Sequence, residues 1–182
     1  LGRSIFDNIK KAISFILAVH VPIVGLSMMP VFIKGFPLLL LPVHIAFLEL
    51  IIDPSCTLIF EAEEAEGDVM QRPPRSPDER LFSRRTVALS ILQGLSVLAL
   101  CLTVLFLARQ EHDPDSARAL TFATLVISSL VIISVNRSRT RSLLAMLTVR
   151  NAAFRYVVGG ALVLLAVMLF VPIVQRLFHF AP

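Results

Sequence analysis

The sequence has no tryptophan, one tyrosine and two cysteines, and it carries few charges for its length of 182 residues. Charged residues make up 16% of the chain, whereas 56% of the residues are hydrophobic and the mean hydropathy is +0.81. These values exclude an ordinary water-soluble globular domain, in which about 25% of the residues are charged. Cys56 and Cys101 lie in apolar stretches without the spacing of a disulfide framework or a metal site. We therefore expect both to be small buried packing residues.

The hydrophobic residues are concentrated in five stretches of 18 to 25 residues, each long enough to cross a bilayer as a helix. The stretches cover residues 12–33, 36–60, 86–108, 119–136 and 156–175. The sequence thus predicts an all-α fold, a polytopic transmembrane helix bundle with five spans. We divide it into residues 1–60 with the first two spans, a cytoplasmic loop at 61–85, and residues 86–182 with three further spans.

The basic residues predict how the chain is oriented in the membrane. With a cytoplasmic N-terminus, 13 of the 17 Lys and Arg residues fall in cytoplasmic segments, and those outside are Lys34, Arg109, Arg118 and Arg176. This distribution satisfies the positive-inside rule. Because the charges sit in loops between spans, they indicate topology and not nucleic-acid binding. We expect an integral protein of the plasma membrane, with the lipid bilayer as a partner.

Two connections have informative compositions. Only Lys34 and Gly35 separate the first two apolar stretches, which predicts a tight hairpin of antiparallel helices. The loop at 61–85 begins with acidic residues and becomes basic and proline-rich at Arg72–Pro77. Such a segment cannot bury a core, so we expect it to lie extended at the membrane surface.

The second span carries two acidic residues, Glu49 and Asp53, four positions apart and therefore on one helical face. On insertion scales an acid at the centre of a membrane helix costs about 2.5 to 3.5 kcal/mol, so such groups persist mainly where they have a function. Two adjacent carboxylates at low dielectric share a proton unless a cation lies between them. The pair predicts a metal site that exchanges protons for a cation. The other interpretation is that the acids only hydrogen-bond to neighbouring helices.

Proline residues within the first two spans mark candidate backbone ligands. Pro54 follows Asp53, removes one backbone donor and displaces the carbonyl of Leu50. In the first span Pro22 does the same to the carbonyl of Ala18, close to His20. Freed carbonyls are tolerated at membrane depth where they line a cavity. We therefore include Leu50, Ala18 and His20 in the ion-binding set, and His20 is a ligand, a proton carrier or a hydrogen-bonded interior histidine.

Other polar residues of the spans receive weaker assignments. Candidates for additional neutral ligands in the fourth span are Ser128, Ser129 and Asn136, although such side chains commonly bond within their own helix or to a neighbour. No phosphate-binding loop, His/Cys metal cluster or nucleophile triad occurs in the sequence, so no catalytic residue is assigned.

Two further predictions concern helix packing. His44 lies nearer the outer end of its span, where we expect it to pack between helices. Gly94 in the third span and the pair Gly159–Gly160 in the fifth are expected to permit close helix contacts, because a missing side chain lets two backbones approach.

Three segments resemble P-type cation-transporting ATPases. Gly2–Lys11 (GRSIFDNIKK) resembles the start of their fifth membrane helix, Pro42–Pro54 (PVHIAFLELIIDP) their sixth helix, and Met70–Pro77 (MQRPPRSP) the loop after it. The match covers about the first 85 residues, and the later spans agree in number, spacing and topology. The resemblance implies the C-terminal membrane part of a calcium-pump-like protein, helices five to nine, coupling ATP hydrolysis to ion transport through an aspartyl-phosphate.

The same resemblance implies partners that this sequence does not contain. These are the phosphorylation, nucleotide-binding and actuator domains, the first four membrane helices, and one more span after Pro182. Mg and ATP are implied for the full-length pump and no cofactor for this chain, which alone should not hydrolyse ATP. The coupling loop, which would transmit the effect of phosphorylation to the membrane helices, would be formed by Arg72, Pro73, Pro74 and Arg75. The other interpretation is a solvated linker held against anionic lipid.

The ligand positions of calcium pumps are only partly retained. Where their sixth helix supplies an Asn, a Thr and an Asp, this sequence has Glu49, Ile52 and Asp53; where their fifth supplies an Asn and a Glu, it has His20 and Ile23. One divalent cation per cycle, such as calcium, with protons in exchange is the favoured cargo. The alternatives are a proton pump of the same family, a channel or transporter that works without ATP, and a truncated module for helix assembly.

Overall fold

The computed structural model describes residues 2–63, 83–137 and 151–180, and this part of the chain is helical without a strand. Its elements are α1 (Gly2–Phe32), α2 (Pro42–Pro54), the π-helical turn η1 (Ser55–Ile59), α3 (Arg84–Glu111), α4 (Pro114–Arg137), α6 (Ala152–Phe170) and α7 (Pro172–Leu177). Five helices are long and apolar enough to cross a membrane, α2 and η1 together forming one of them. The predicted all-α class and the number of spans are confirmed, as expected for an integral membrane protein.

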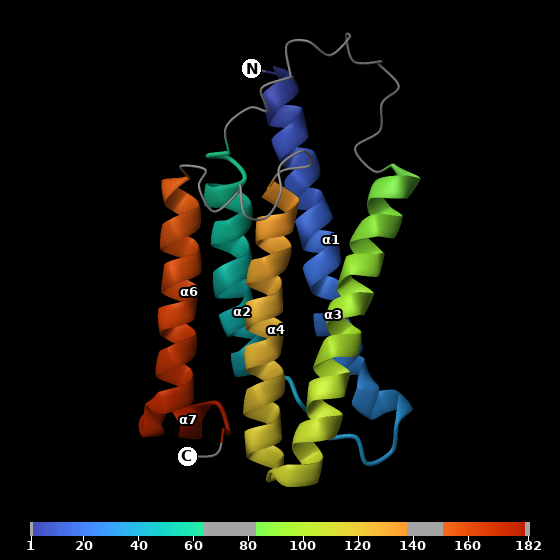
Figure 1. Ribbon diagram of the computed structural model, residues 1–182, viewed down its shortest axis with the longest axis vertical. Helices are drawn as coiled ribbons and strands as arrows, with labels where there is room; N and C mark the ends of the chain where they lie inside the picture. Colours follow the sequence, from blue (N-terminus) through green and yellow to red (C-terminus); the bar gives the residue numbers. More distant parts are fainter. Residues whose placement is uncertain (1, 64–82, 138–150, 181–182) are drawn as a thin grey trace.

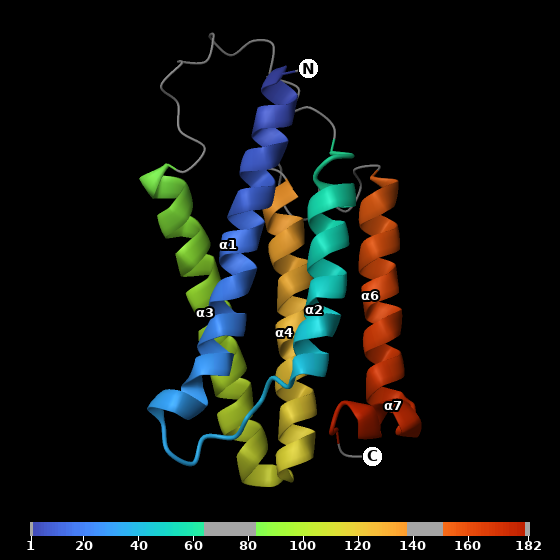
Figure 2. The ribbon, with the colours of Figure 1, turned by 180° about the vertical axis from the view of Figure 1, so that it is seen from behind.

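The long helices stand side by side along one direction (Figure 1). Helix α1 packs against α3 and α4, and α3 also packs against α4. From behind, α3 and α6 form the two flanks, with α1, α4 and α2 between them (Figure 2). We call the end with the start of α1 the N-terminal end; it also holds the starts of α3 and α6. Cys101 is buried, Cys56 is half-buried, and both are free thiols.

The second span begins later than the hydropathy predicts. A stretch from Phe36 was expected to be helical, but α2 starts at Pro42. Pro37 and Pro42 disfavour helical geometry in the residues before them, and Leu41 is extended with φ −79° and ψ 161°. The predicted two-residue hairpin connection is therefore wrong, and residues 33–41 form the connection instead. Gly35 takes a positive φ of 81° within it.

The fifth span ends earlier than predicted. The apolar stretch continues to Gln175, but α6 ends at Phe170 and the chain turns at Val171, which has φ −96° and ψ 114°. Pro172 again explains the break, because it restricts the preceding residue and cannot continue the hydrogen-bond ladder. The short α7 then runs across the end of the bundle (Figure 1). Gln175 is buried there and donates to the carbonyl of Leu169 at 2.6 Å.

Of the two close helix contacts predicted at glycines, one is present and one is not. A Cβ added to Gly94 would lie 2.5 Å from the carbonyl oxygen of Ala18 and 2.5 Å from the Cβ of Val21, so α1 and α3 touch through this glycine as predicted. A Cβ on Gly159 or Gly160 would meet no atom within 4 Å. The close contact predicted for this pair is wrong, because a hollow lined by Gly160 of α6 and by Leu50 and Pro54 of α2 separates the two helices there.

His44 packs between helices, as predicted, at the end opposite the N-terminal one. Its side chain is fully buried among the rings of Phe122, Phe178 and Phe180, whose centroids lie 4.9 to 5.5 Å away. The N–H of Leu41 donates to Nδ1 at 2.9 Å, so the neutral ring carries its hydrogen on Nε2, which donates to the carbonyl of Phe178 at 2.9 Å. The histidine thus ties the start of α2 to the segment after α7.

Candidate functional site

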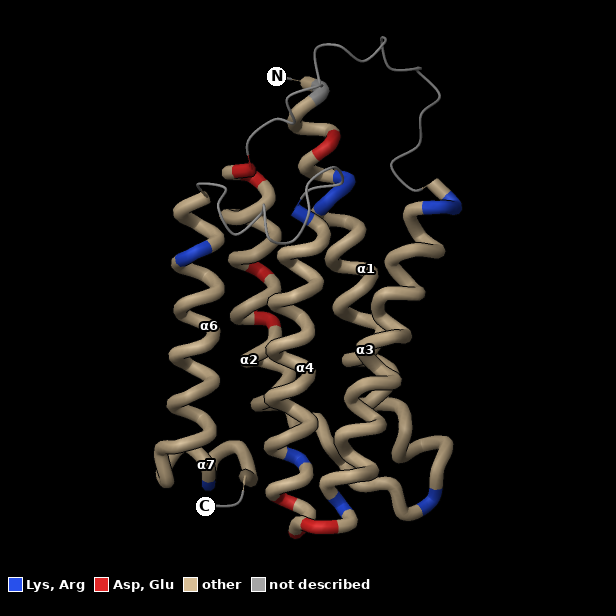
Figure 3. Tube along the Cα trace, viewed as in Figure 1, with Lys and Arg blue, Asp and Glu red and all other residues tan. Residues whose placement is uncertain are grey.

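The candidate site lies halfway along the span formed by α2 and η1. Figure 3 shows two acidic positions in the middle of this span, whereas most other charged residues of the described chain lie toward the two ends of the bundle. The two positions are Glu49 and Asp53, one helical turn apart as predicted. The span around them is apolar, with a mean hydropathy of 1.4, so neither charge belongs to a polar surface.

The structure brings His20 of α1 to Glu49 of α2. The imidazole Nε2 lies 3.7 Å from Oε1 of Glu49. The other ring nitrogen, Nδ1, lies 2.8 Å from the carbonyl of Ile16, and a carbonyl can only accept a hydrogen bond. Nδ1 is therefore the donor, and in the neutral ring Nε2 is an acceptor close to the Glu49 carboxylate. A proton on Nε2 would make this contact an ion pair, and a metal cation could bind both groups.

Asp53 completes the acidic face but lies open. Its side chain is exposed and forms no hydrogen bond or ion pair with the rest of the described chain, while its backbone carbonyl accepts from the hydroxyl of Thr57 at 2.9 Å. The side chains of His20 and Glu49 are also 40% and 42% exposed. Acids at membrane depth face a bundle interior or a water-filled path. In the described part of the chain no other element fully covers this acidic face.

The backbone changes its helical pattern directly after the acids. Pro54 has no N–H to give to the carbonyl of Leu50, and the following residues form the π-helical turn η1. In it the N–H of Phe60 donates to the carbonyl of Ser55 at 3.3 Å, five residues back. Such π turns occur frequently at functional sites. The interruption predicted at Pro54 is present, and it places Leu50 beside the acids on α2.

The carbonyl of Ala18, the other predicted backbone ligand, does not lie beside the acid pair. It points at Gly94 of α3, the glycine at which α1 and α3 touch. Pro22 lies inside the continuous helix α1, so it deprives this carbonyl of a partner without breaking the helix. The structure therefore places Ala18 at the contact between α1 and α3 and does not bring it to the acid pair.

The neutral candidates of α4 bond within the bundle. Ser129 donates to the carbonyl of Leu125 at 2.8 Å, and the amide of Asn136 donates to Gln93 Oε1 at 3.2 Å and to the carbonyl of Ile132 at 3.0 Å. Ser128 is buried on the same helix. The coupling-loop residues Arg72, Pro73, Pro74 and Arg75 lie outside the described residues.

The chemistry available at the site follows from these positions. Two carboxylates and one imidazole nitrogen can bind a cation or pass a proton, with the Leu50 carbonyl as a neutral oxygen nearby. Among the described residues no group of three or more His, Cys, Asp and Glu side chains converges on one point. The chain alone thus offers part of a coordination sphere, fewer than the six to eight oxygens that calcium takes.

A second polar cluster, at the N-terminal end, escaped the sequence analysis. Arg137, the last residue of α4, is fully buried, and its Nε donates to Oε2 of Glu63 at 2.8 Å. The amide of Asn151 donates to the same Oε2 at 2.9 Å and to the carbonyl of Ile59 at 3.2 Å. The Arg137 guanidinium also stacks 4.2 Å from the ring centroid of Phe154. We call Glu63, Arg137 and Asn151 the buried polar cluster.

The buried polar cluster joins four elements. Glu63 follows η1, Arg137 ends α4, and Asn151 caps α6 by accepting from the N–H of Phe154 at 2.9 Å. On the α1 side, the amide of Asn8 donates to the carbonyl of Glu63 at 3.1 Å. The only sequence signal was an Asn before an apolar helix, which is typical of an N-cap. The cluster therefore fixes the C-terminal end of the span that carries the acid pair, which lies at the N-terminal end of the bundle.

The fold is a polytopic helical membrane domain, and one of its spans carries two acidic side chains on one face. The family model described as "Cation transporting ATPase, C-terminus" matches residues 37–182, and the chain belongs to this family. The resemblance to P-type cation-transporting ATPases, which rests on the first part of the sequence, is confirmed.

The similar proteins are all named as calcium-transporting ATPases. A calcium-transporting ATPase of Bacillus subtilis (strain 168) is 29% identical over 181 residues, which is 98% of this chain and 20% of that protein. Calcium-transporting ATPase 1 of Schizosaccharomyces pombe is 27% identical over 98% of this chain, and calcium-transporting ATPase type 2C member 2 of Homo sapiens is 24% identical over 98%. The chain spans about one fifth of the length of these relatives, so it corresponds to one part of a larger pump.

Proposed function

We propose that this chain is the ion-translocating membrane domain of a P-type ATPase that moves a divalent cation, with calcium as the favoured cargo and protons returning in exchange. The observation that carries the proposal is the position of His20 Nε2, 3.7 Å from Glu49 Oε1, with Asp53 one turn away on a membrane helix. The names of the relatives support calcium, since those proteins are calcium-transporting ATPases.

The incomplete coordination sphere fits a domain that functions within a larger protein. The acid pair is open on one side, and remaining membrane helices of the pump would cover it and supply further oxygens. The same remainder would supply the phosphorylation, nucleotide-binding and actuator domains, and with them Mg and ATP. Residues of this chain then bind the cation, while phosphorylation elsewhere changes the side from which the site is open.

The orientation follows from the charges. The described basic residues at the N-terminal end include Lys10, Lys11, Arg84 and Arg85, whereas the opposite end holds Lys34, Arg109, Arg118 and Arg176. With the positive-inside rule applied to the whole sequence, the N-terminal end faces the cytoplasm. The acid pair then lies between a cytoplasmic end fixed by the buried polar cluster and an outer end fixed by His44. We place the pump in the plasma membrane.

Calcium-dependent phosphorylation of the intact pump tests the site. Glu49→Gln and Asp53→Asn should each raise the calcium concentration for half-maximal phosphorylation at least about tenfold, because even indirect supports of a metal site contribute that much to affinity. The matched control is Glu111→Gln, an acid exposed at the end of α3, which should leave the calcium dependence unchanged. Unchanged dependence in both site variants would remove the site assignment.

A proton pump of the same family is the second candidate, and the His20 geometry favours it specifically. A lone pair on Nε2 facing a carboxylate can hold a shared proton as readily as a metal. In that case phosphorylation of the intact pump would depend on pH and not on calcium. His20→Asn, which cannot bring a ring nitrogen to Glu49, would then shift the pH profile.

A further inference from the structure

We propose that a polar pocket at the N-terminal end of the bundle binds the phosphate group of an anionic phospholipid. The pocket has a volume of about 530 Å³ and lies between α1, α3 and α4. It is separate from the Glu49 site, and its lining residues are not used in the transport step proposed above. The inference concerns lipid binding and does not depend on which ion the pump moves.

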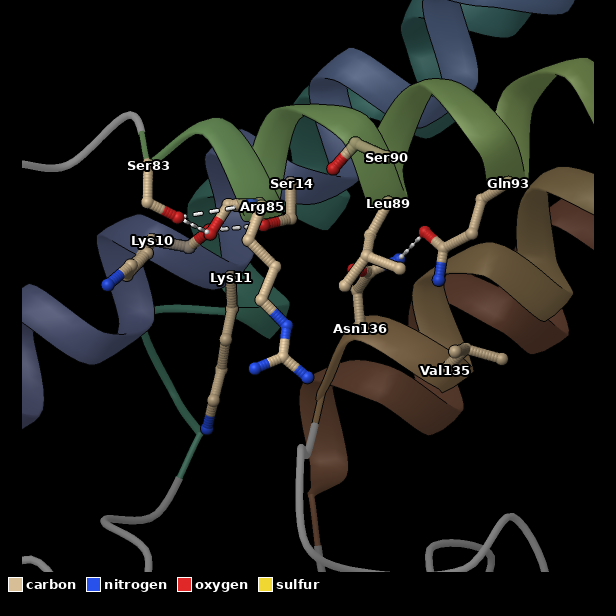
Figure 4. A pocket seen from close by; sticks show the side chains of 11 residues that line it. Lys10, Lys11, Ser14, Ser83, Arg85, Leu89, Ser90, Gln93, Val135 and Asn136 are labelled. Carbon is tan, nitrogen blue, oxygen red and sulfur yellow. Dashed lines mark hydrogen bonds between the residues drawn. The ribbon is translucent and has the colours of Figure 1, made fainter.

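Cationic side chains from two helices line the pocket. Lys10 and Lys11 come from α1, and Arg85 comes from the first turn of α3. In Figure 4, Arg85 extends from α3 between Lys11 and Asn136 of α4. No acidic side chain occurs among the described residues that line it. The lining therefore contributes positive charge from both sides, a composition that selects a negatively charged group.

A helix end adds to this preference. Ser14 and Asn136 line the pocket but already donate within the bundle, Ser14 to the carbonyl of Lys10 at 2.8 Å and Asn136 to Gln93 and Ile132, whereas Ser90 is buried at the wall. The N-terminus of α3, capped by Ser83 through a 3.1 Å bond from the N–H of Thr86, lies at the same pocket. The first turn of a helix presents N–H groups and a partial positive charge, both favourable for a phosphate oxygen.

The depth of the pocket points to a lipid headgroup. The apolar part of α1 begins at Ala12, directly after the two lysines, and the apolar part of α3 begins directly after Arg85. The cations thus lie where a membrane helix leaves the hydrocarbon region, at the level of phospholipid phosphates. Leu89 and Val135 line the same pocket and give an apolar wall for the start of an acyl chain.

The charge of the lining discriminates between headgroups. A zwitterionic lipid such as phosphatidylcholine would bring a cationic group of its own to this basic lining, whereas a lipid with a net negative headgroup would not. Inorganic phosphate in the cytoplasm has the same charged group as a lipid headgroup. It has no acyl chain to contact the apolar wall formed by Leu89 and Val135. An anionic lipid of the cytoplasmic leaflet is therefore the occupant that matches both parts of the pocket.

Thermal unfolding of the full-length protein in mild detergent tests the proposal. Phosphatidylglycerol should raise the melting temperature, whereas phosphatidylcholine with the same acyl chains, or inorganic phosphate alone, should not. Arg85→Gln and Lys11→Gln should each weaken the response to phosphatidylglycerol about fivefold, the contribution of one basic residue near an anionic surface. Arg84→Gln is the matched control, because Arg84 is the exposed neighbour of Arg85 and does not line the pocket.

Three results would each overturn the proposal that the pocket binds an anionic lipid. An unchanged phosphatidylglycerol response in Arg85→Gln would overturn the proposal, and so would an equal response to phosphatidylcholine. Stabilisation by inorganic phosphate without lipid would also overturn it, because the occupant would then be a soluble anion. Should Lys11→Gln fail to fold, the comparison of Arg85→Gln with Arg84→Gln remains decisive, since both side chains are exposed.

Discussion

At the scale of single residues, the buried polar cluster places two opposite charges inside the bundle. The side chains of Arg137 and Glu63 are 0% and 6% exposed, so both charges have lost nearly all their hydration. Two charge-assisted bonds between them and the Asn151 amide compensate for that loss. Among the described residues Arg137 Nη1 has no hydrogen-bond partner, so the pair is not fully satisfied.

Removing one member of this pair should destabilise the protein strongly. Glu63→Gln leaves the Arg137 guanidinium buried without a counter-charge, and breaking a buried ion pair from one side costs about 3–5 kcal/mol. We expect a loss of that order in the free energy of unfolding, measured by thermal or denaturant unfolding of the detergent-solubilised protein. The side-chain amide introduced by Glu63→Gln would still accept a hydrogen bond, so the loss reports mainly the missing charge.

Two controls separate charge from packing. Arg155→Gln changes an exposed arginine of α6 and should move the stability by no more than about 0.5 kcal/mol. Replacing both partners with apolar residues, as in Glu63→Leu with Arg137→Met, should cost less than Glu63→Gln alone, because no charge is left buried. If Glu63→Gln were as stable as Arg155→Gln, the Glu63–Arg137 pair would not be desolvated in the folded protein.

Sequence reasoning found the acid pair and missed this cluster for a physical reason. Glu49 and Asp53 lie one turn apart, so helical periodicity alone places them on one face. Glu63 and Arg137 are 74 positions apart, and only the tertiary fold brings them together. In the sequence Glu63 belongs to an acidic run and Arg137 to the arginines that set topology, where single charges are normally solvated.

At the scale of elements, hydropathy predicted the five spans but not all of their ends. The start of α2 and the break after α6 are both set by prolines, which act on the residue before them whatever its hydropathy. Glycines show the same limit: both Gly94 and Gly160 lie in apolar spans, but of the two only Gly94 touches another helix. Which face of a span is covered depends on tertiary packing, and a single sequence does not contain that information in a local pattern.

The contact at Gly94 predicts a large difference between two equal substitutions. In Gly94→Ala the new methyl group would lie 2.5 Å from both the Ala18 carbonyl oxygen and the Val21 Cβ, so α1 and α3 must move apart. Overpacking of this kind costs about 1–3 kcal/mol. Gly160→Ala places the same methyl in open space and should be neutral or slightly stabilising, since alanine favours the helix.

Unfolding of the two glycine variants in the same detergent measures this difference directly. If Gly94→Ala were as stable as Gly160→Ala, α1 and α3 would not approach at this glycine. That outcome would also mean that the Ala18 carbonyl does not lie against Gly94. Ala18 would then again be a candidate ion ligand.

At the scale of the whole molecule, the helices differ in how much of their surface the chain itself covers. Helix α4 is the most buried of the five spans, whereas α3 and α6 are the least buried. Between their charged ends, the exposed residues of α3 and α6 are mostly apolar and suit lipid or further membrane helices, for example Leu92, Phe106 and Val163. On α2, by contrast, the open face carries acids. A lipid contact there is unfavourable, so this is the face that the rest of a pump would cover.

The orientation of the whole domain bears on both the proposed ion site and the proposed lipid pocket. Chemical labelling in right-side-out membrane vesicles tests this orientation. In a protein with Cys56 and Cys101 replaced by Ala, Lys34→Cys should react with a membrane-impermeant maleimide in sealed vesicles, because Lys34 is exposed at the outer end. Arg84→Cys, exposed at the N-terminal end, should react only after the vesicles are opened. The reverse pattern would place Lys10, Lys11 and Arg85 outside the cell, against the positive-inside rule and away from any cytoplasmic phosphorylation domain.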